Sequence, residues 1–247
     1  MPERPPCPPH PVLSAYYRTK GERVQFVRSI FDRTAAHYDR INTIFSLGSG
    51  RWYRRRMLRM AGLRSGQSLL DVATGTGLVA QEAATLTDAA NIVGLDMSLG
   101  MLAQCQHKLP IQLVLADAQN LPVADASVDM LSMGYALRHV HDLTATFAGY
   151  LKAIKPGGHI LILEIGRADN RLVQFLLRFY LGRVVPLLSG VTASHESRTL
   201  MAYYWDTIEE CVPPARILET MKAVGFDKVR KQTSFGVFHA YMAERRQ

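Results

Sequence analysis

A glycine-rich turn between two acidic residues is the clearest chemical pattern in this sequence. Asp71 lies in an apolar run that leads at once into the turn at residues 74–77. Gly75 and Gly77 have no Cβ atom, so the backbone of the turn can approach a ligand closely. A second apolar run ends at Asp96, about 20 residues beyond the turn, where a carboxylate suits the hydroxyl pair of a ribose. This spacing predicts a nucleoside site, whereas a dinucleotide site needs the full G-x-G-x-x-G.

Strand and helix signals alternate around this turn and place it in an α/β fold. Apolar runs predict strands over residues 68–73, 91–96, 112–116, 128–133 and 159–165. Helices are predicted between them, over residues 78–86, 98–108 and 142–154. Strands that are apolar on both faces are typical of a parallel sheet covered by helices on both sides. A helix over 215–224 and two strands, over 227–234 and 236–243, close the chain.

The residues before the first predicted strand differ in composition from the rest. Residues 1–11 hold six of the 12 prolines and no apolar signal segment, so residues 1–21 are interpreted as a Pro-rich disordered tail. Helices are predicted over 22–42 and 51–60. We interpret the whole of 22–62 as a helical part that faces the substrate or a membrane.

One segment near the C-terminal half interrupts the alternation. Residues 169–188 place Arg171, Gln174 and Arg178 on one stripe and apolar side chains on the other faces. This pattern predicts an amphipathic helix, which we interpret as a lid within an insertion at 169–212. Such a helix packs on the core, touches a lipid-like ligand, or does both.

Composition restricts the partners and the compartment. The net charge is +8, and arginines cluster within 51–59 and 167–183 beside apolar side chains such as Trp52. This mixture favours an anionic membrane surface over nucleic acid, with a solvated basic face as the alternative. The three cysteines are too far apart in the sequence for a metal motif, which predicts no metal and a reducing compartment. We expect a cytoplasmic protein, peripheral at the inner face of the membrane.

The glycine turn and three later motifs resemble one class of enzyme. Residues 71–77 look like motif I of the class I S-adenosylmethionine-dependent methyltransferases, and the later motif positions hold Asp117-Ala118, Asp129 and Lys155-Pro156-Gly157-Gly158. The resemblance implies a Rossmann-like α/β fold over residues 22–247. In that fold a mostly parallel seven-stranded sheet carries helices on both faces, here with the added lid helix. It also implies S-adenosyl-L-methionine as the cofactor.

Two further blocks narrow the resemblance. Residues 31–39 and 136–142 resemble the UbiE-type C-methyltransferases of ubiquinone and menaquinone biosynthesis. The family implies methylation of a carbon on a polyprenylated benzoquinol or naphthoquinol ring, with a lipophilic aromatic substrate at a membrane surface. A homodimer or a quinone-biosynthesis complex is left open.

The resemblance and the turn together assign site residues. The expected cofactor-binding residues are Asp71, Ala73, Gly75, Thr76, Gly77, Asp96, Met97, Asp117, Ala118 and Gly134. Asp96 accepts from the ribose hydroxyls, Asp117 accepts from the adenine amino group, and Asp71 orients the turn. The expected catalytic residues are Tyr38, Arg138 and His139. Arg138 stabilises a phenolate because it is always charged, and His139 is either a general base or a structural residue.

Several positions depart from the family pattern. The family usually has an acid at Leu78, methionine at Ile41, histidine at Gly50 and asparagine at His139, and residues 165–167 also differ. These departures lie near the expected active site. They leave the identity of the methyl acceptor open but do not affect the assignment of the cofactor. The alternatives are N- or O-methylation of a phospholipid headgroup or a secondary metabolite, and a non-catalytic, partner-binding subunit. Absence of an Asn/Asp-Pro-Pro-aromatic motif disfavours methylation of nucleic-acid amines.

Overall fold

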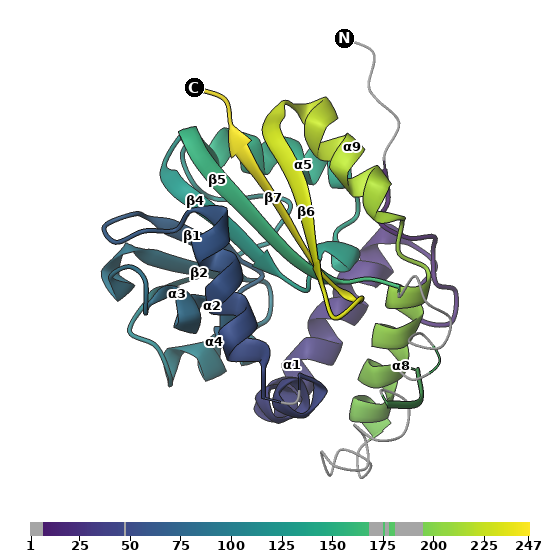
Figure 1. Ribbon diagram of the computed structural model, residues 1–247. Coiled ribbons are helices and arrows are strands. Elements are labelled where there is room, and N and C mark those ends of the chain that lie inside the picture. Colours follow the sequence, from purple (N-terminus) through teal and green to yellow (C-terminus); the bar gives the residue numbers. More distant parts are fainter. Residues whose placement is uncertain (1–6, 47, 168–174, 176–177, 181–194) are drawn as a thin grey trace.

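A seven-stranded β-sheet forms the centre of the computed structural model, which describes residues 7–46, 48–167, 175, 178–180 and 195–247 (Figure 1). The strand order is β3-β2-β1-β4-β5-β7-β6. The strands are β1 (Leu69–Val72), β2 (Ile92–Asp96), β3 (Gln112–Leu115), β4 (Val128–Gly134), β5 (Ile154–Ile165), β6 (Phe226–Ser234) and β7 (Phe238–Arg245). Strands β1 to β5 are parallel, and β7 is antiparallel to both of its neighbours. The predicted fold class, a mostly parallel seven-stranded sheet, is confirmed.

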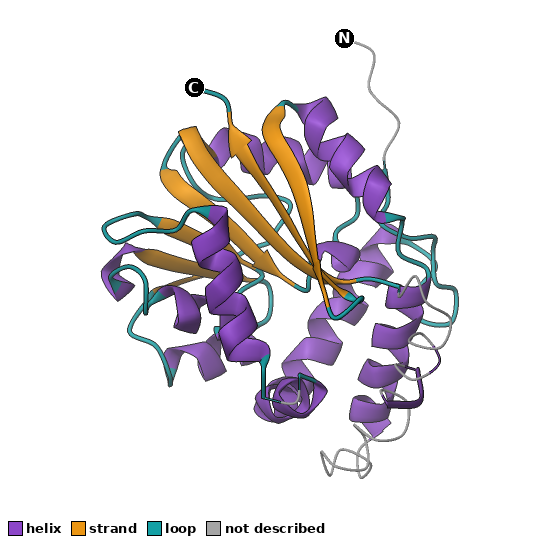
Figure 2. Cartoon of the chain, in the orientation of Figure 1, coloured by secondary structure: helices purple, strands orange, loops and turns teal. Residues whose placement is uncertain are grey.

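Helices cover both faces of this sheet (Figure 2). They are α1 (Lys20–Phe45), α2 (Gly50–Ala61), α3 (Leu78–Ala83), α4 (Leu99–Gln106), α5 (Leu143–Ala153), α8 (His195–Glu209) and α9 (Pro214–Val224). Short 3₁₀ turns lie at Ala89–Asn91 and Leu137–His139. Figure 1 shows α5 and α9 on one face and α2 on the other.

Alternation along each strand produces two hydrophobic cores, one on each face of the sheet. Leu70 and Tyr241 belong to the core that includes side chains of α5 and α9, such as Phe147. Leu69, one residue earlier, belongs to the core that includes Tyr53 of α2. Because neighbouring side chains of a strand point to opposite faces, a strand buried on both faces must be apolar throughout. This explains why the continuous apolar runs of the sequence predicted the strands.

Polar residues just before several helices determine where those helices begin. Thr19 accepts a hydrogen bond from the backbone of Glu22 at the start of α1. Ser98 does the same for α4, and Asp142 for α5. These side chains satisfy backbone N–H groups that have no partner within the helix. Ser98 and Asp142 follow β2 and β4 in the chain, so α4 and α5 begin close to the loops that form the site.

The segment from residue 7 to 19 is packed against the domain, so the expectation of disorder is wrong for these residues. The Cys7 backbone N–H donates to Asp142 Oδ1 (3.1 Å), and the His10 and Tyr17 side chains are buried. Prolines have a fixed φ and lose little backbone entropy on folding, so a Pro-rich segment with buried side chains can be ordered. The first six residues lie outside the described part.

The predicted lid helix at 169–188 falls mostly outside the described residues. Within it, the Tyr180 hydroxyl donates to the backbone carbonyl of Ile44 at the end of α1 (2.5 Å). The Arg178 guanidinium lies 5.9 Å from the centre of the Trp205 ring on α8. The boundary of the insertion and its action as a lid stay predictions.

Helix α1 lies across the carboxyl end of the parallel strands and is tied to both loops of the site. Asp32 accepts from the Ser98 hydroxyl (2.5 Å) and from the backbone of Gly100 (3.0 Å) at the start of α4. Asp39 accepts from the Thr76 hydroxyl of the glycine turn. Asp32 and Asp39 are seven residues apart, so they lie on the same face of α1. Their hydrogen bonds hold this helix over the glycine turn and the start of α4.

Helices α2 and α3 are joined by a buried carboxylate. Glu82 of α3 is fully buried and accepts from Arg51 Nε (2.7 Å) and from Arg55 Nη2 (2.7 Å) of α2. Two members of the basic cluster predicted at 51–59 therefore share one internal carboxylate, which cancels one of their two positive charges. A third, Arg54, is buried. The exposed positive charge of this helix is smaller than the sequence indicated.

Glu82→Gln should lower the free energy of unfolding by about 1–3 kcal/mol, because a buried acceptor of two charged hydrogen bonds loses its charge. Urea unfolding measures the difference. Glu219→Gln is the matched control, because Glu219 and Arg216 form an exposed pair at 3.8 Å and such pairs contribute about 0–1 kcal/mol. Equal effects of the two substitutions would contradict a structural role for the buried carboxylate.

Candidate active site

A cavity at the carboxyl ends of β1, β2 and β4 brings together most of the expected cofactor-binding residues. It encloses about 800 Å³ of empty space that is partly open to solvent. Seven of the ten residues line it: Ala73, Gly75, Asp96, Met97, Asp117, Ala118 and Gly134. In open α/β sheets, ligands bind outside the carboxyl ends of the strands. We call this the cofactor cavity.

Asp96 is buried at the end of β2 and holds the glycine turn. One carboxylate oxygen accepts from the Gly75 N–H (2.8 Å) and the other from the Ser98 N–H (2.9 Å). Burial raises the pKa of this carboxyl group to about 6. Each carboxylate oxygen can accept a further hydrogen bond, so two hydroxyl donors can still bind. This pair of acceptor oxygens fits the two hydroxyl groups of a ribose.

The other three expected cofactor residues lie behind or beside the turn. Asp71 lines no cavity. It accepts from the hydroxyls of Thr74 (2.7 Å) and Ser132 (2.6 Å), so it orients the turn as expected, and burial raises its pKa to about 6. Gly77 caps α3 with a left-handed φ of 86°, and a Cβ atom there would lie 2.6 Å from Cys105 Sγ. Thr76 lines a recess beside the turn.

A second cavity of about 650 Å³, also partly open to solvent, adjoins the first. Tyr38 and Tyr135 line both cavities, so their side chains stand where the two meet. The remaining walls are mostly aromatic and aliphatic, and they include Phe238, Ile208 and Arg138. An aromatic ring fits such a space, and we call it the acceptor cavity.

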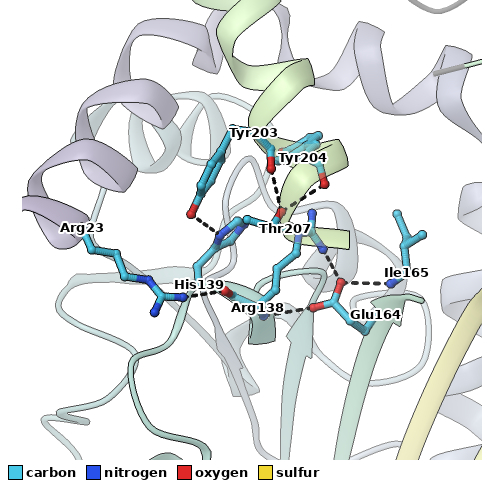
Figure 3. Close-up of polar contacts among 8 residues, drawn as sticks. All are labelled: Arg23, Arg138, His139, Glu164, Ile165, Tyr203, Tyr204 and Thr207. Carbon is cyan, nitrogen blue, oxygen red and sulfur yellow. Dashed lines mark hydrogen bonds and ion pairs between the residues drawn. The ribbon is translucent and has the colours of Figure 1, made fainter. Parts of the chain in front are cut away.

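Arg138 joins the wall of the acceptor cavity to the end of β5. Its guanidinium forms a buried ion pair with Glu164, which also accepts from the backbone of Ile165 (2.9 Å) (Figure 3). The guanidinium lies 5.1 Å from the centre of the Tyr204 ring on α8. Burial acts to lower the pKa of Arg138, but the charge of Glu164 acts in the opposite direction and the pKa is raised overall. This side chain therefore remains a cation.

His139, the next residue, lines the cofactor cavity instead. Its Nδ1 atom lies 3.1 Å from the Tyr203 hydroxyl, and its ring stacks on that of Tyr203 (Figure 3). Burial, followed by the positive charge of Arg138, lowers its pKa well below the usual 6.5. The imidazole is therefore neutral at physiological pH and held among aromatic rings.

Among the residues of these walls that sequence reasoning missed, three have the clearest chemical or structural role. Tyr135 lines both cavities with a left-handed φ of 61°, a conformation that a tyrosine rarely adopts. Asn42 and Arg54 line the acceptor cavity. Tyr135 could have been found from its position directly after β4. Arg54 could have been found because it lies one helical turn after Gly50, a position that departs from the family pattern.

The fold and these two cavities define a class I methyltransferase. Residues 18–244 match the ubiE/COQ5 methyltransferase family, and the chain belongs to this family. The chain is 32% identical over 235 residues to the ubiquinone/menaquinone biosynthesis C-methyltransferase UbiE of Geobacter sulfurreducens, covering 92% of this chain and 90% of the relative. It is 31% identical to the demethylmenaquinone methyltransferase of Symbiobacterium thermophilum, covering 83% and 86%.

Solved structures agree with the fold. The complex between the Haloferax volcanii Trm112 methyltransferase activator and a methyltransferase matches 88% of this chain and 98% of that chain, with a TM-score of 0.63 and 16% identity. Phosphoethanolamine N-methyltransferase 2 of Haemonchus contortus, in complex with S-adenosyl-L-methionine, matches 79% of this chain and 52% of that chain, with a TM-score of 0.57 and 17% identity. The chain is an S-adenosylmethionine-dependent methyltransferase.

Asp96→Asn should weaken the binding of S-adenosylmethionine by about 2 kcal/mol, or about thirtyfold, because the ribose hydroxyls lose a charged acceptor. For the native protein, affinity should fall as the pH drops through about 6, where Asp96 takes up a proton. The Asn variant should show a weaker dependence, with only the part that Asp71 contributes through its own pKa of about 6. Calorimetry between pH 5 and about 7.5, a range that spans the titration of Asp96, measures both effects. The exposed Asp88→Asn is the control; if it matched Asp96→Asn, the assignment would be wrong.

Proposed function

We propose that this enzyme methylates a ring carbon of a polyprenylated benzoquinol or naphthoquinol. The observation that carries the proposal is the acceptor cavity, an aromatic-walled space that meets the cofactor cavity at Tyr38 and Tyr135 and contains a buried arginine. Aromatic walls together with two arginines suit an electron-rich ring better than a headgroup amine, because the arginines repel a cationic amine. Two relatives with more than 30% identity are named for quinone-biosynthesis methylation.

Carbon methylation needs a ring that is rich in electrons. Loss of the proton from a quinol hydroxyl to water, at the solvent-open side of the cavity, increases electron density at the neighbouring ring carbon. The hydrogen of that carbon leaves as a second proton once the new carbon–carbon bond has formed. Arg138, at the wall of the cavity, stabilises the resulting negative oxygen, and its ion pair with Glu164 holds the guanidinium in one orientation. When bound, S-adenosylmethionine supplies an electrophilic methyl group. The cavity walls exclude water and hold the ring near the glycine turn.

His139 is proposed as a positioning residue rather than the general base. It lines the cofactor cavity and is neutral, because burial lowers its pKa well below 6.5. An imidazole of low basicity is a poor acceptor for a quinol proton at neutral pH. Its contacts with Tyr203 and Phe31 hold α8 and α1 against the site. Tyr38 is proposed to contact the acceptor.

A radiolabelled methyl-transfer assay on demethylated quinols, followed by mass identification of the product, tests this function. Arg138→Lys should lower kcat by about tenfold or more, because it keeps the charge but loses the planar fork that pairs with Glu164. His139→Asn should keep kcat within a few-fold and leave the pH profile above 6.5 unchanged. If His139→Asn lowered kcat about a hundredfold and removed the pH dependence, His139 would be the general base. If the demethylated quinols gained no labelled methyl group, the proposed acceptor would be wrong.

The proposal places the mouth of the acceptor cavity against an anionic membrane, as a lipophilic quinol requires. No helix in the described ranges is long and apolar enough to span a bilayer. Phe235 lines the cavity and is 68% exposed, and Trp52 on α2 is 55% exposed. Phe235 contacts Phe238, which contacts Tyr53 of α2, so the two exposed rings lie on connected elements. Exposed aromatic rings beside basic residues suit a membrane interface.

Replacing both Trp52 and Phe235 with Ser should reduce flotation with anionic vesicles several-fold, because two rings leave the interface. Arg56→Ser and Arg59→Ser should make the remaining binding less sensitive to salt, since these arginines are exposed. Leu115→Ser, an exposed apolar side chain at the far strand β3, is the control. Flotation that is equal in all variants would argue for a solvated face.

A further inference from the structure

Arg54 is a buried arginine without a counter-ion among the residues described. It lies on α2 with only 5% of its surface exposed. Its Nε atom has no hydrogen-bond partner, and its guanidinium lies 5.6 Å from the centre of the Tyr135 ring. Removing a cation from water is unfavourable unless another group compensates for the lost hydration. A single aromatic face compensates only in part, so Arg54 can still bind an anion.

The acceptor cavity carries an excess of positive charge. Arg54 and Arg138 both line it, and in the part of the chain that is described no aspartate or glutamate does. Arg138 is already paired with Glu164, whereas Arg54 has no such partner. The Tyr53 hydroxyl, in the same wall, is also buried without a hydrogen bond. Two residues with an unsatisfied buried donor thus line the same cavity.

Gly50 is the residue that makes room for this guanidinium. It lies one helical turn before Arg54 on the same face of α2. A Cβ atom at position 50 would lie 2.7 Å from Arg54 Nη1 and 2.9 Å from Ser46 Oγ. Gly50 and Ser46 line the acceptor cavity but not the recess beside the glycine turn, which Arg54 also borders. The Nη1 end of Arg54 is therefore on the acceptor side.

We propose that Arg54 binds a negatively charged oxygen of the methyl acceptor, and that Gly50 permits this contact. The inference rests on the proposed function, because it takes the second cavity to be the acceptor site. It adds that the bound acceptor carries an oxyanion, as a phenolate or a ring carboxylate, at the α2 side of the cavity. That oxygen is distinct from the one that Arg138 stabilises. Arg54 is thus a specificity-determining residue.

The test compares the binding of two small probes to the full chain saturated with S-adenosylhomocysteine. The probes are 1-hydroxy-2-naphthoate, which carries a carboxylate, and 1-naphthol, which does not. The native protein should bind the carboxylate at least about tenfold more tightly, the usual effect of a buried charge-assisted hydrogen bond. Arg54→Met should abolish this preference and leave 1-naphthol binding unchanged. Arg56→Met, an exposed arginine on the same helix, should keep it.

Gly50→Ala provides a second and independent variant. Gly50 has no left-handed φ, and alanine favours a helix more than glycine does, so the substitution introduces no backbone strain. The added methyl group displaces the guanidinium, so the preference should fall as in Arg54→Met while the melting temperature is kept. Gly149→Ala in α5, where a Cβ atom meets nothing within 4 Å, is the matched control and should change neither.

Two results would overturn the proposal. One is an equal preference for the carboxylate in native protein and Arg54→Met. The other is weaker S-adenosylmethionine binding in Arg54→Met with the probe preference intact, which would assign the guanidinium to the carboxylate of the cofactor. Probe binding does not depend on turnover. An Arg54-dependent preference without quinol methylation would therefore reject the proposed quinol acceptor alone, and quinol methylation without the preference would reject this inference alone.

Discussion

The buried ion pair between Arg138 and Glu164 is the interaction on which the arrangement of the site depends. It joins the turn after β4 to the end of β5, where the cofactor and acceptor cavities adjoin. The Arg138 carbonyl also accepts from Arg23 Nη2 (2.8 Å), which ties α1 to the same turn (Figure 3). Buried ion pairs contribute little net stability, because desolvation offsets their attraction. The value of this pair is positional, because the ion pair and the hydrogen bond from Arg23 together fix the orientation of the turn.

Consecutive residues of this turn serve different cavities as a consequence. Arg138 lines the acceptor cavity and His139 lines the cofactor cavity. The charge of the first lowers the pKa of the second, in addition to the larger effect of burial. One fixed cation thus provides a positive wall for an acceptor oxygen and keeps its neighbour neutral. This arrangement supports the proposed positioning role of His139.

The two cavities have opposite electrostatic character. Asp96 and Asp117 line the cofactor cavity, where hydroxyl and amino groups need acceptors. Arg54 and Arg138 line the acceptor cavity, where the proposed mechanism places negative charge on a ring oxygen. This separation makes each cavity a poor site for the other ligand. Arg51 and Arg55, which lie close to Arg54 in sequence, pair with Glu82 of α3 and do not line the acceptor cavity.

The fold and the cofactor side of the site followed from the sequence, because they depend on short segments. Continuous apolar strands, a glycine turn and the acids Asp71 and Asp96 are local features, and the physics that relates them to a parallel sheet is general. Seven expected cofactor residues line one cavity for this reason. They meet at the carboxyl ends of the strands, where open α/β sheets bind their ligands.

Only the tertiary structure decided the charge state and surroundings of individual side chains. The sequence places Arg54 in a surface cluster, but contact between α2 and the sheet buries it. The neutral state of His139 depends on aromatic rings from α1 and α8, segments far away in the chain. Cys7 and His10 are ordered because they pack against the domain. Burial and pKa depend on neighbours brought together by folding, and no local pattern contains that information.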